Sequence, residues 1–164
     1  MPTYYPPNGS SSSSTSSTTT YVQTADESES AGTQTSSTYL TATVLAGATY
    51  LVECYLLFES AAATTGAQFC LTGPTNNASE GTSLHAPSGT TSELSRSGLL
   101  GTVIANTGQP TGSPFPSLGL ASAVFTTHAS APSPATITVQ FKTEVAASAV
   151  TLKKGSVMKL TRLI

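Results

Sequence analysis

The stretch Thr49–Glu59, TYLVECYLLFE, decides how the rest of this sequence is interpreted. Its large apolar residues recur at every second position, the spacing that places side chains on one face of a β-strand. A helix of this length is possible, but aromatic and branched residues favour a strand. The residues on this face are Tyr50, Val52, Cys54, Leu56 and Phe58. We therefore predict a long strand whose inner face forms part of a hydrophobic core.

The opposite face of the same stretch is also partly apolar. It carries Leu51, Glu53, Tyr55, Leu57 and Glu59. A strand that is buried on one side only alternates apolar residues with polar ones facing water. Either another part of the fold or another subunit must therefore cover this second face. We favour a subunit, in a homotrimer with Leu51, Tyr55 and Leu57 at or near the contact.

Outward from this stretch, the sequence reads as short strands separated by turn-rich segments. Residues 74–98 are expected to form a long loop with one short strand at most. The clearest alternation lies near the C-terminus, where Ile137, Val139, Phe141 and Val145 are predicted to point inward and Thr138 outward. The other expected strands are residues 38–45, 66–71, 99–105, 120–127, 150–152 and 157–164.

These segments amount to about eight strands without a convincing helix. An all-β fold must bury one face of each strand and protect its edges, which predicts a jelly-roll β-sandwich. The chain of 164 residues is long enough for one such domain, which we assign to residues 21–164.

Residues 1–20 are expected to form an extended, low-complexity arm. An unbroken run of Ser and Thr from Ser10 to Thr20 follows Tyr4 and Tyr5. Such a segment cannot bury enough surface of its own to offset the entropy lost on ordering. We expect another chain to order it, with Tyr4 and Tyr5 as aromatic anchors.

Charge and composition favour a protein that is part of an assembly over a nucleic-acid-binding or membrane-spanning protein. Charged residues make up only 9% of the chain, which suits a protein packed in an assembly. The net charge of −2 argues against direct nucleic-acid binding, and no apolar run reaches the length of a membrane span. Most acidic residues precede residue 60, whereas most basic ones follow Lys142. The basic residues are either solvated positions or a basic edge that docks onto an acidic partner.

The sequence carries no pattern typical of a catalytic, cofactor or metal site. His85 and His128 are isolated in loop-like sequence, and no nucleophile elbow, phosphate-binding loop or zinc-protease motif is present. The acids Asp26, Glu27 and Glu29 suit a solvated loop better than a calcium site. Without a secretory signal at the start, we expect folding in the cytoplasm and two free, buried cysteines in preference to a disulfide.

Two parts of the chain resemble compact β-domains in virion proteins of tailed bacteriophages. The first runs through residues 37–58 and 66–74, and the second through residues 135–144 and 150–160. These domains are similar in outline to the jelly rolls of tumour necrosis factor and of complement globular heads. The resemblance covers roughly half of the chain. It implies a jelly roll, commonly trimeric, that decorates or cements a capsid or forms part of a tail or fibre, without catalytic residues.

Together these features predict a structural virion protein that is assembled in the host cytoplasm. The predicted role is capsid decoration or cementing, with the major capsid protein or another virion protein as partner. The alternative is a receptor- or carbohydrate-binding module of a phage tail or fibre. Sugar sites commonly expose aromatic platforms, whereas this chain has no Trp and most of its aromatic residues fall at core positions.

Overall fold

The computed structural model describes residues 16–62, 65–74, 77–88, 92–98, 104–105, 117–127, 129 and 135–163. These residues form twelve β-strands. No helix in this described part of the chain is long and apolar enough to cross a membrane. The strands are β1 (Ser17–Val22), β2 (Glu27–Glu29), β3 (Thr35–Val44), β4 (Thr49–Ser60), β5 (Ala67–Thr72), β6 (Asn77–Ser88), β7 (Ser92–Gly98), β8 (Ile104–Ala105), β9 (Ser117–Thr127), β10 (Ala135–Thr143), β11 (Val150–Leu152) and β12 (Val157–Arg162).

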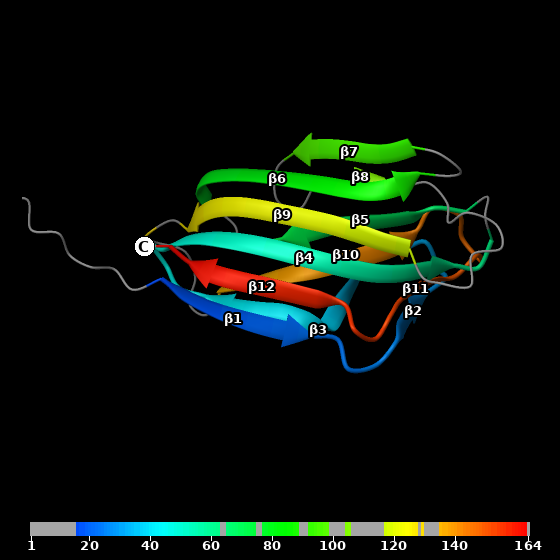
Figure 1. The fold of residues 1–164 in the computed structure, drawn as a ribbon, viewed down its shortest axis with the longest axis horizontal. Coiled ribbons are helices and arrows are strands. Elements are labelled where there is room, and N and C mark those ends of the chain that lie inside the picture. The colour runs from blue at the N-terminus through cyan, green and yellow to red at the C-terminus, as the bar shows by residue number, and fades with distance from the viewer. Residues whose placement is uncertain are drawn as a thin grey trace, which may run out of the picture.

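The strands form two antiparallel sheets that face each other (Figure 1). The larger sheet has the order β1-β12-β4-β9-β6-β7, and β11 joins it by pairing with β2 and β4. The smaller sheet has the order β3-β10-β5-β8. The all-β sandwich predicted from the sequence is therefore confirmed.

The strand order is that of a jelly roll. The first strand pairs with the last, β1 with β12, and the pairs β3–β10, β4–β9 and β5–β8 follow in a nested series. Successive pairs alternate between the larger and the smaller sheet, as in a folded ribbon wrapped around a core. The hairpin β6–β7 is inserted inside the innermost pair and extends the larger sheet beyond β9.

The core lies between the sheets and is built from the alternation seen in the sequence. All five inner residues of β4 are buried, as predicted. The ring of Phe58 packs edge-on against that of Phe69 from the smaller sheet, with centroids 5.1 Å apart. Tyr50 stacks on Phe125 of β9 with centroids 5.6 Å apart. The contact between Phe58 and Phe69 therefore joins the two sheets, whereas that between Tyr50 and Phe125 packs neighbouring strands of the larger sheet on the core side.

The predicted orientation is right for the four residues within β10 and wrong for Val145, which lies beyond the strand. Ile137, Val139 and Phe141 are buried. Val145 is 50% exposed instead of inward, because β10 ends at Thr143 and the alternation stops with it. Thr138 is only 8% exposed although it alternates with the inward residues, because Thr41 and Thr72 flank it in register on both neighbouring strands.

The loop predicted over residues 74–98 is wrong. This segment contains β6 and β7, which pair with each other, and β6 also pairs with β9. Its polar, glycine-containing sequence lacks the apolar alternation that predicts a strand. These residues adopt the strand conformation because their backbones pair with neighbouring strands. Of the strand expected over residues 99–105, the structure describes only β8 at Ile104–Ala105.

The boundary between arm and domain lies earlier than predicted. β1 begins at Ser17, so residues 17–20 belong to the domain and not to the arm. Hydroxyl residues are tolerated there because β1 is an edge strand with one face in water, and Thr18 hydrogen-bonds to Thr161 with 2.9 Å between the hydroxyl oxygens. Residues 1–15, with Tyr4 and Tyr5, lie outside the described residues.

The core predicts a sharp difference between two substitutions on β10. We expect Phe141→Ala to lower the free energy of unfolding by about 3–5 kcal/mol, because it leaves a cavity at a fully packed position. Thr136→Ala, on the exposed face of the same strand, should cost less than about 1 kcal/mol. Denaturant unfolding followed by circular dichroism would measure both. Equal losses would mean that the register of β10 is displaced by one residue.

Candidate interaction surface

The outer face of the larger sheet carries ordered rows of side chains that cross its strands. Residues paired in register lie on the same face, so each row can be followed from strand to strand. The first apolar row is Val22, Val157, Tyr55 and Leu120. The charged row is Thr20, Lys159, Glu53 and Ser122. The second apolar row is Thr18, Thr161, Leu51 and Val124.

Large apolar side chains are unusually exposed on this face. They are Val22 (48%), Tyr55 (40%), Leu118 (47%), Leu120 (39%) and Val124 (49%). Among the described side chains, none of the exposed large apolar residues belongs to a strand of the smaller sheet. Contiguous exposed apolar residues on a soluble protein mark a contact surface.

Strand β9 shows the same preference over residues 118–124, where small residues face the core and larger ones face outward, before Phe125 returns a large side chain to the core. Gly119, Ala121 and Ala123 face the core, because they pair in register with the inward residues of β4. The larger side chains of Leu118, Leu120 and Val124 point outward. A strand selected only for its own core would place its larger aliphatic residues inside. This arrangement is typical of a strand whose outer face is covered in an assembly.

The three predicted contact residues share this outer face but differ in exposure. Tyr55 is exposed, whereas Leu51 and Leu57 are half-buried. The turn between β11 and β12 bonds to the backbone of Leu57, through Lys153 N to Leu57 O (2.8 Å) and Leu57 N to Ser156 Oγ (2.9 Å). Tyr55 is thus the most accessible of the three. That a subunit covers them stays a prediction.

Sequence reasoning missed the contributions of β1 and β9 to this face. Val22 directly follows the hydroxyl-rich run of the expected arm, so no strand is predicted there. Leu118 lies before the strand expected at residues 120–127. The alternation of large and small residues in β9 was a usable signal, since every second residue from Leu118 to Val124 is larger than its alanine or glycine neighbours, with Ser122 as the exception.

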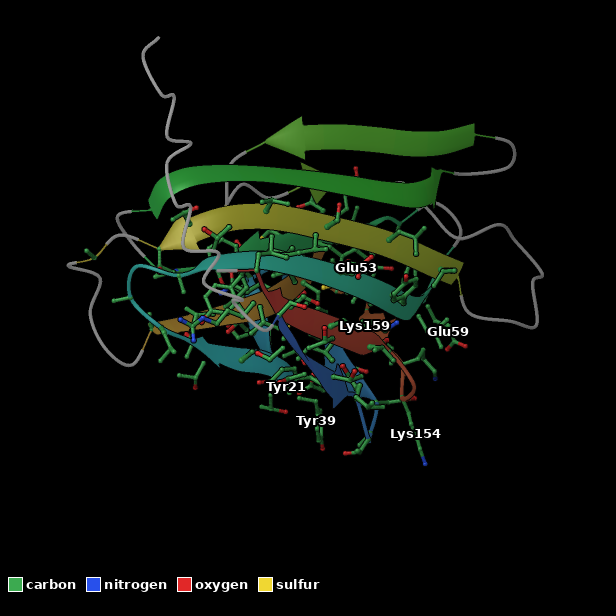
Figure 2. The ribbon with its side chains drawn as sticks, turned by 60° about the vertical axis from the view of Figure 1, so that its left-hand side comes forward. Tyr21, Tyr39, Glu53, Glu59, Lys154 and Lys159 are labelled. Carbon is green, nitrogen blue, oxygen red and sulfur yellow. The ribbon has the colours of Figure 1, made fainter. Side chains whose placement is uncertain are left out.

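Two opposite charges lie side by side in the middle of this face. Lys159 of β12 is directly opposite Glu53 of β4 in register, and both are half-buried (Figure 2). The Lys159 ammonium lies 5.6 Å from the centroid of the Tyr55 ring, within the range of a cation–π contact. Within the described residues, no ion pair joins Lys159 to Glu53, since both salt bridges there involve Lys153.

Lys153, in the turn before β12, forms ion pairs with the segment before β2 and with the end of β4. Its ammonium lies 2.6 Å from the Asp26 carboxylate and 3.3 Å from that of Glu59. The hydrogen bond between Lys153 and Asp26 lowers the pKa of the Asp26 carboxyl and raises the pKa of the Lys153 ammonium. All three side chains are partly exposed, so this cluster contributes a modest stabilisation of about 1 kcal/mol or less.

The C-terminal strand does not form a basic edge of the sheet, and docking of its basic residues onto an acidic partner stays a prediction. β12 lies between β1 and β4 and is not an edge of the sheet. Its Lys159, like Lys153 in the turn before it, adjoins acidic residues of the same chain because antiparallel pairing brings the two halves together. Lys154 and Arg162 remain exposed.

The acidic cluster near the N-terminus is divided among separate structural roles. Asp26 binds Lys153, and Glu27 Oε1 accepts a hydrogen bond from the Thr38 amide (2.9 Å). Glu29 is buried, contrary to the expected solvated loop, and Thr143 N donates to its Oε2 (2.8 Å). Across the described part of the chain, no group of three His, Cys, Asp or Glu side chains could hold a metal ion.

The remaining residues singled out from the sequence do not form a reactive centre in the described structure. His85 lies in β6 opposite Leu120 and not in a loop, and His128 is outside the described residues. Cys54 and Cys70 are free and buried, as expected. Burial raises the pKa of both thiols, that of Cys70 to about 11, where Gln34 donates a hydrogen bond to the sulfur and opposes the rise.

Comparison with known proteins yields only distant structural similarity. No protein-family model matches the chain. No curated protein matches it either. A structure of infectious bursal disease virus, Gt strain, aligns with a TM-score of 0.26 and 14% identity, over 90% of this chain and 37% of that one. The VP2 subviral particle of the same virus gives a TM-score of 0.23 at 12% identity, over 92% of this chain and 41% of that one.

This chain therefore spans less than half the length of those viral chains. A likeness with so low a TM-score carries no argument about the fold or the function of this chain. Neither of these two structures comes from a tailed bacteriophage, so the resemblance to tailed-phage domains remains a prediction.

The raised thiol pKa values predict slow alkylation with a defined pH dependence. A pKa of about 11 leaves roughly one thiolate in a thousand at pH 8 for Cys70, and only the thiolate reacts. We expect iodoacetamide labelling of Cys70 in the folded protein to rise about tenfold per pH unit between pH 7 and 9 without levelling off. Peptide mass spectrometry would follow each cysteine.

The unfolded protein is the control for this measurement. In guanidinium chloride both thiols should label quickly, and the rate should level off above the ordinary thiol pKa of about 8.5. Labelling of Cys70 at pH 7 at the unfolded rate would contradict its burial.

Proposed function

We propose that this chain is a structural protein of a bacteriophage virion, a capsid decoration or cement protein that self-associates through the outer face of its larger sheet. The observation that carries this proposal is the exposure of Tyr55, Leu120 and Val124 together on one sheet face, with the small residues of β9 turned toward the core. Burying such rows against another subunit removes apolar area from water, which is the main driving force of association.

A homotrimer is the assembly that the resemblance implies, and the low charge of the chain supports an assembled state. With charged residues at 9%, little electrostatic repulsion keeps copies apart. A cement protein gains from trimerisation, because linked copies bind a shell at several points and their combined affinity exceeds that of one contact.

We assign attachment to the shell to the N-terminal arm, with Tyr4 and Tyr5 as anchors. β1 begins at Ser17 opposite Arg162, so the arm joins the domain at the same end as the C-terminus. The Ser/Thr run has almost no apolar surface, but its backbone can add as a strand to a neighbour's sheet edge. The major capsid protein or another virion protein would supply that edge.

The alternative function, a receptor- or carbohydrate-binding module, finds less support in the described residues. Such sites use exposed aromatic rings, and Tyr50 and all four phenylalanines of the described side chains are buried. Tyr21 and Tyr39 are half-buried (Figure 2). Tyr55 is the exposed aromatic residue, and it lies within the apolar rows.

Substitution of Tyr55 tests self-association. We expect the purified protein to be a trimer at micromolar concentration and Tyr55→Asp to shift it to monomer, because the substitution places a charge in the first apolar row. Mass photometry and sedimentation velocity would measure the mass. Val145→Asp is the matched control, since Val145 is also exposed but lies in the turn region after β10, outside the strands of the larger sheet. A wild-type monomer that Tyr55→Asp leaves unchanged would remove the proposal.

Deletion of the arm tests attachment separately. Removing residues 2–15 keeps all of β1, so the domain and its oligomer should stay intact. Binding to shells that lack the native protein should fall at least tenfold, or about 1.4 kcal/mol. A pelleting assay with purified shells would measure it, with Tyr4→Ala/Tyr5→Ala as a second variant. Unchanged binding by the deletion variant would show that the arm is not the attachment.

A further inference from the structure

The charged row sets a condition on any partner that covers the outer face of the larger sheet. Lys159 and Glu53 lie between the first and second apolar rows, so a surface that buries both rows also covers these two charges. A buried charge without a counter-charge is costly. Each of the two charges has the other as its neighbour in the same chain, and a partner that places a negative group near Lys159 and a positive group near Glu53 would complete the compensation of both.

We propose that the partner is a second copy of this chain, and that Lys159 and Glu53 form a closed ring of alternating charges around the axis of the homotrimer. This inference rests on the proposed self-association and deepens it by naming the register of the contact. The axis runs parallel to β4 and β12, in front of the outer face.

The threefold symmetry of the proposed trimer brings opposite charges of neighbouring copies together. Rotation about an axis parallel to the strands preserves height along them, so each row of one copy meets the same row of the next copy. Within a copy, Lys159 and Glu53 stand on adjacent strands about 4.8 Å apart. Around the axis the charges then alternate, and each Lys159 has a Glu53 of its own chain on one side and a Glu53 of the neighbouring chain on the other.

The rows on either side of the ring fit the same arrangement. Tyr55 and Val157 of the first apolar row would meet their counterparts on one side of the ring, and Leu51 on the other. The cation–π contact already draws the Lys159 ammonium toward the Tyr55 ring, which offsets part of its desolvation. A lipid surface or a polyanion satisfies Lys159 but leaves Glu53 without a partner, so neither fits the row as well as a second copy does.

Charge reversal tests the ring on the full-length protein. Glu53→Lys and Lys159→Glu each leave the charged row with charges of one sign only. We expect either substitution to raise the dissociation constant of the trimer at least 100-fold. The double variant Glu53→Lys/Lys159→Glu restores the alternation and should return to within about tenfold of the wild type, by sedimentation equilibrium. Both positions are partly exposed, and circular dichroism would check that each variant is folded.

A matched control and two outcomes complete the test. Lys154→Glu makes the same change of charge at an exposed turn next to the sheet and should leave the trimer unaffected. A wild-type trimer that tolerates both single reversals, or a double variant that is as weak as the singles, would overturn the ring while leaving self-association in place. A monomeric wild type would overturn the proposed self-association and the ring with it.

Discussion

Antiparallel pairing between the two ends of the chain is the constraint on which the rest of the structure depends. β12 inserts between β1 and β4, so the last strand is paired on both sides within the larger sheet. The nested pairs β3–β10, β4–β9 and β5–β8 follow from this closure. The same pairing brings the basic C-terminal segment beside the acidic N-terminal half, which places Lys153 between Asp26 and Glu59.

Three buried polar side chains form hydrogen bonds that link the two sheets. Gln23 Nε2 donates to Leu152 O (3.1 Å), and Ser37 of the smaller sheet donates to Gln23 Oε1 (3.4 Å). The Glu29 carboxylate accepts from the Thr143 amide of β10. Buried polar groups that are satisfied in this way specify one arrangement of the two sheets, because any shift would leave them without partners.

The two outer faces of the sandwich differ in chemistry. On the smaller sheet, Thr41, Thr138 and Thr72 form a hydroxyl row across three strands, and Gln140 lies opposite Ser36 on the same face. On the larger sheet, the rows combine exposed apolar side chains with the pair of charges and a few hydroxyl residues. A difference of this kind between the two faces suits a subunit that has one fixed orientation in an assembly. The hydroxyl face is compatible with water.

The sequence by itself determined the all-β class and the inner faces of β4 and β10, because a period of two is a local property that each strand displays alone. It also placed Leu51, Tyr55 and Leu57 on one face. Only the tertiary structure showed that β6 and β7 are strands, since polar segments become strands through pairing with a neighbour. The apolar rows and the position of Lys159 opposite Glu53 depend on register between strands distant in sequence, and register is set by the packing of the whole sandwich.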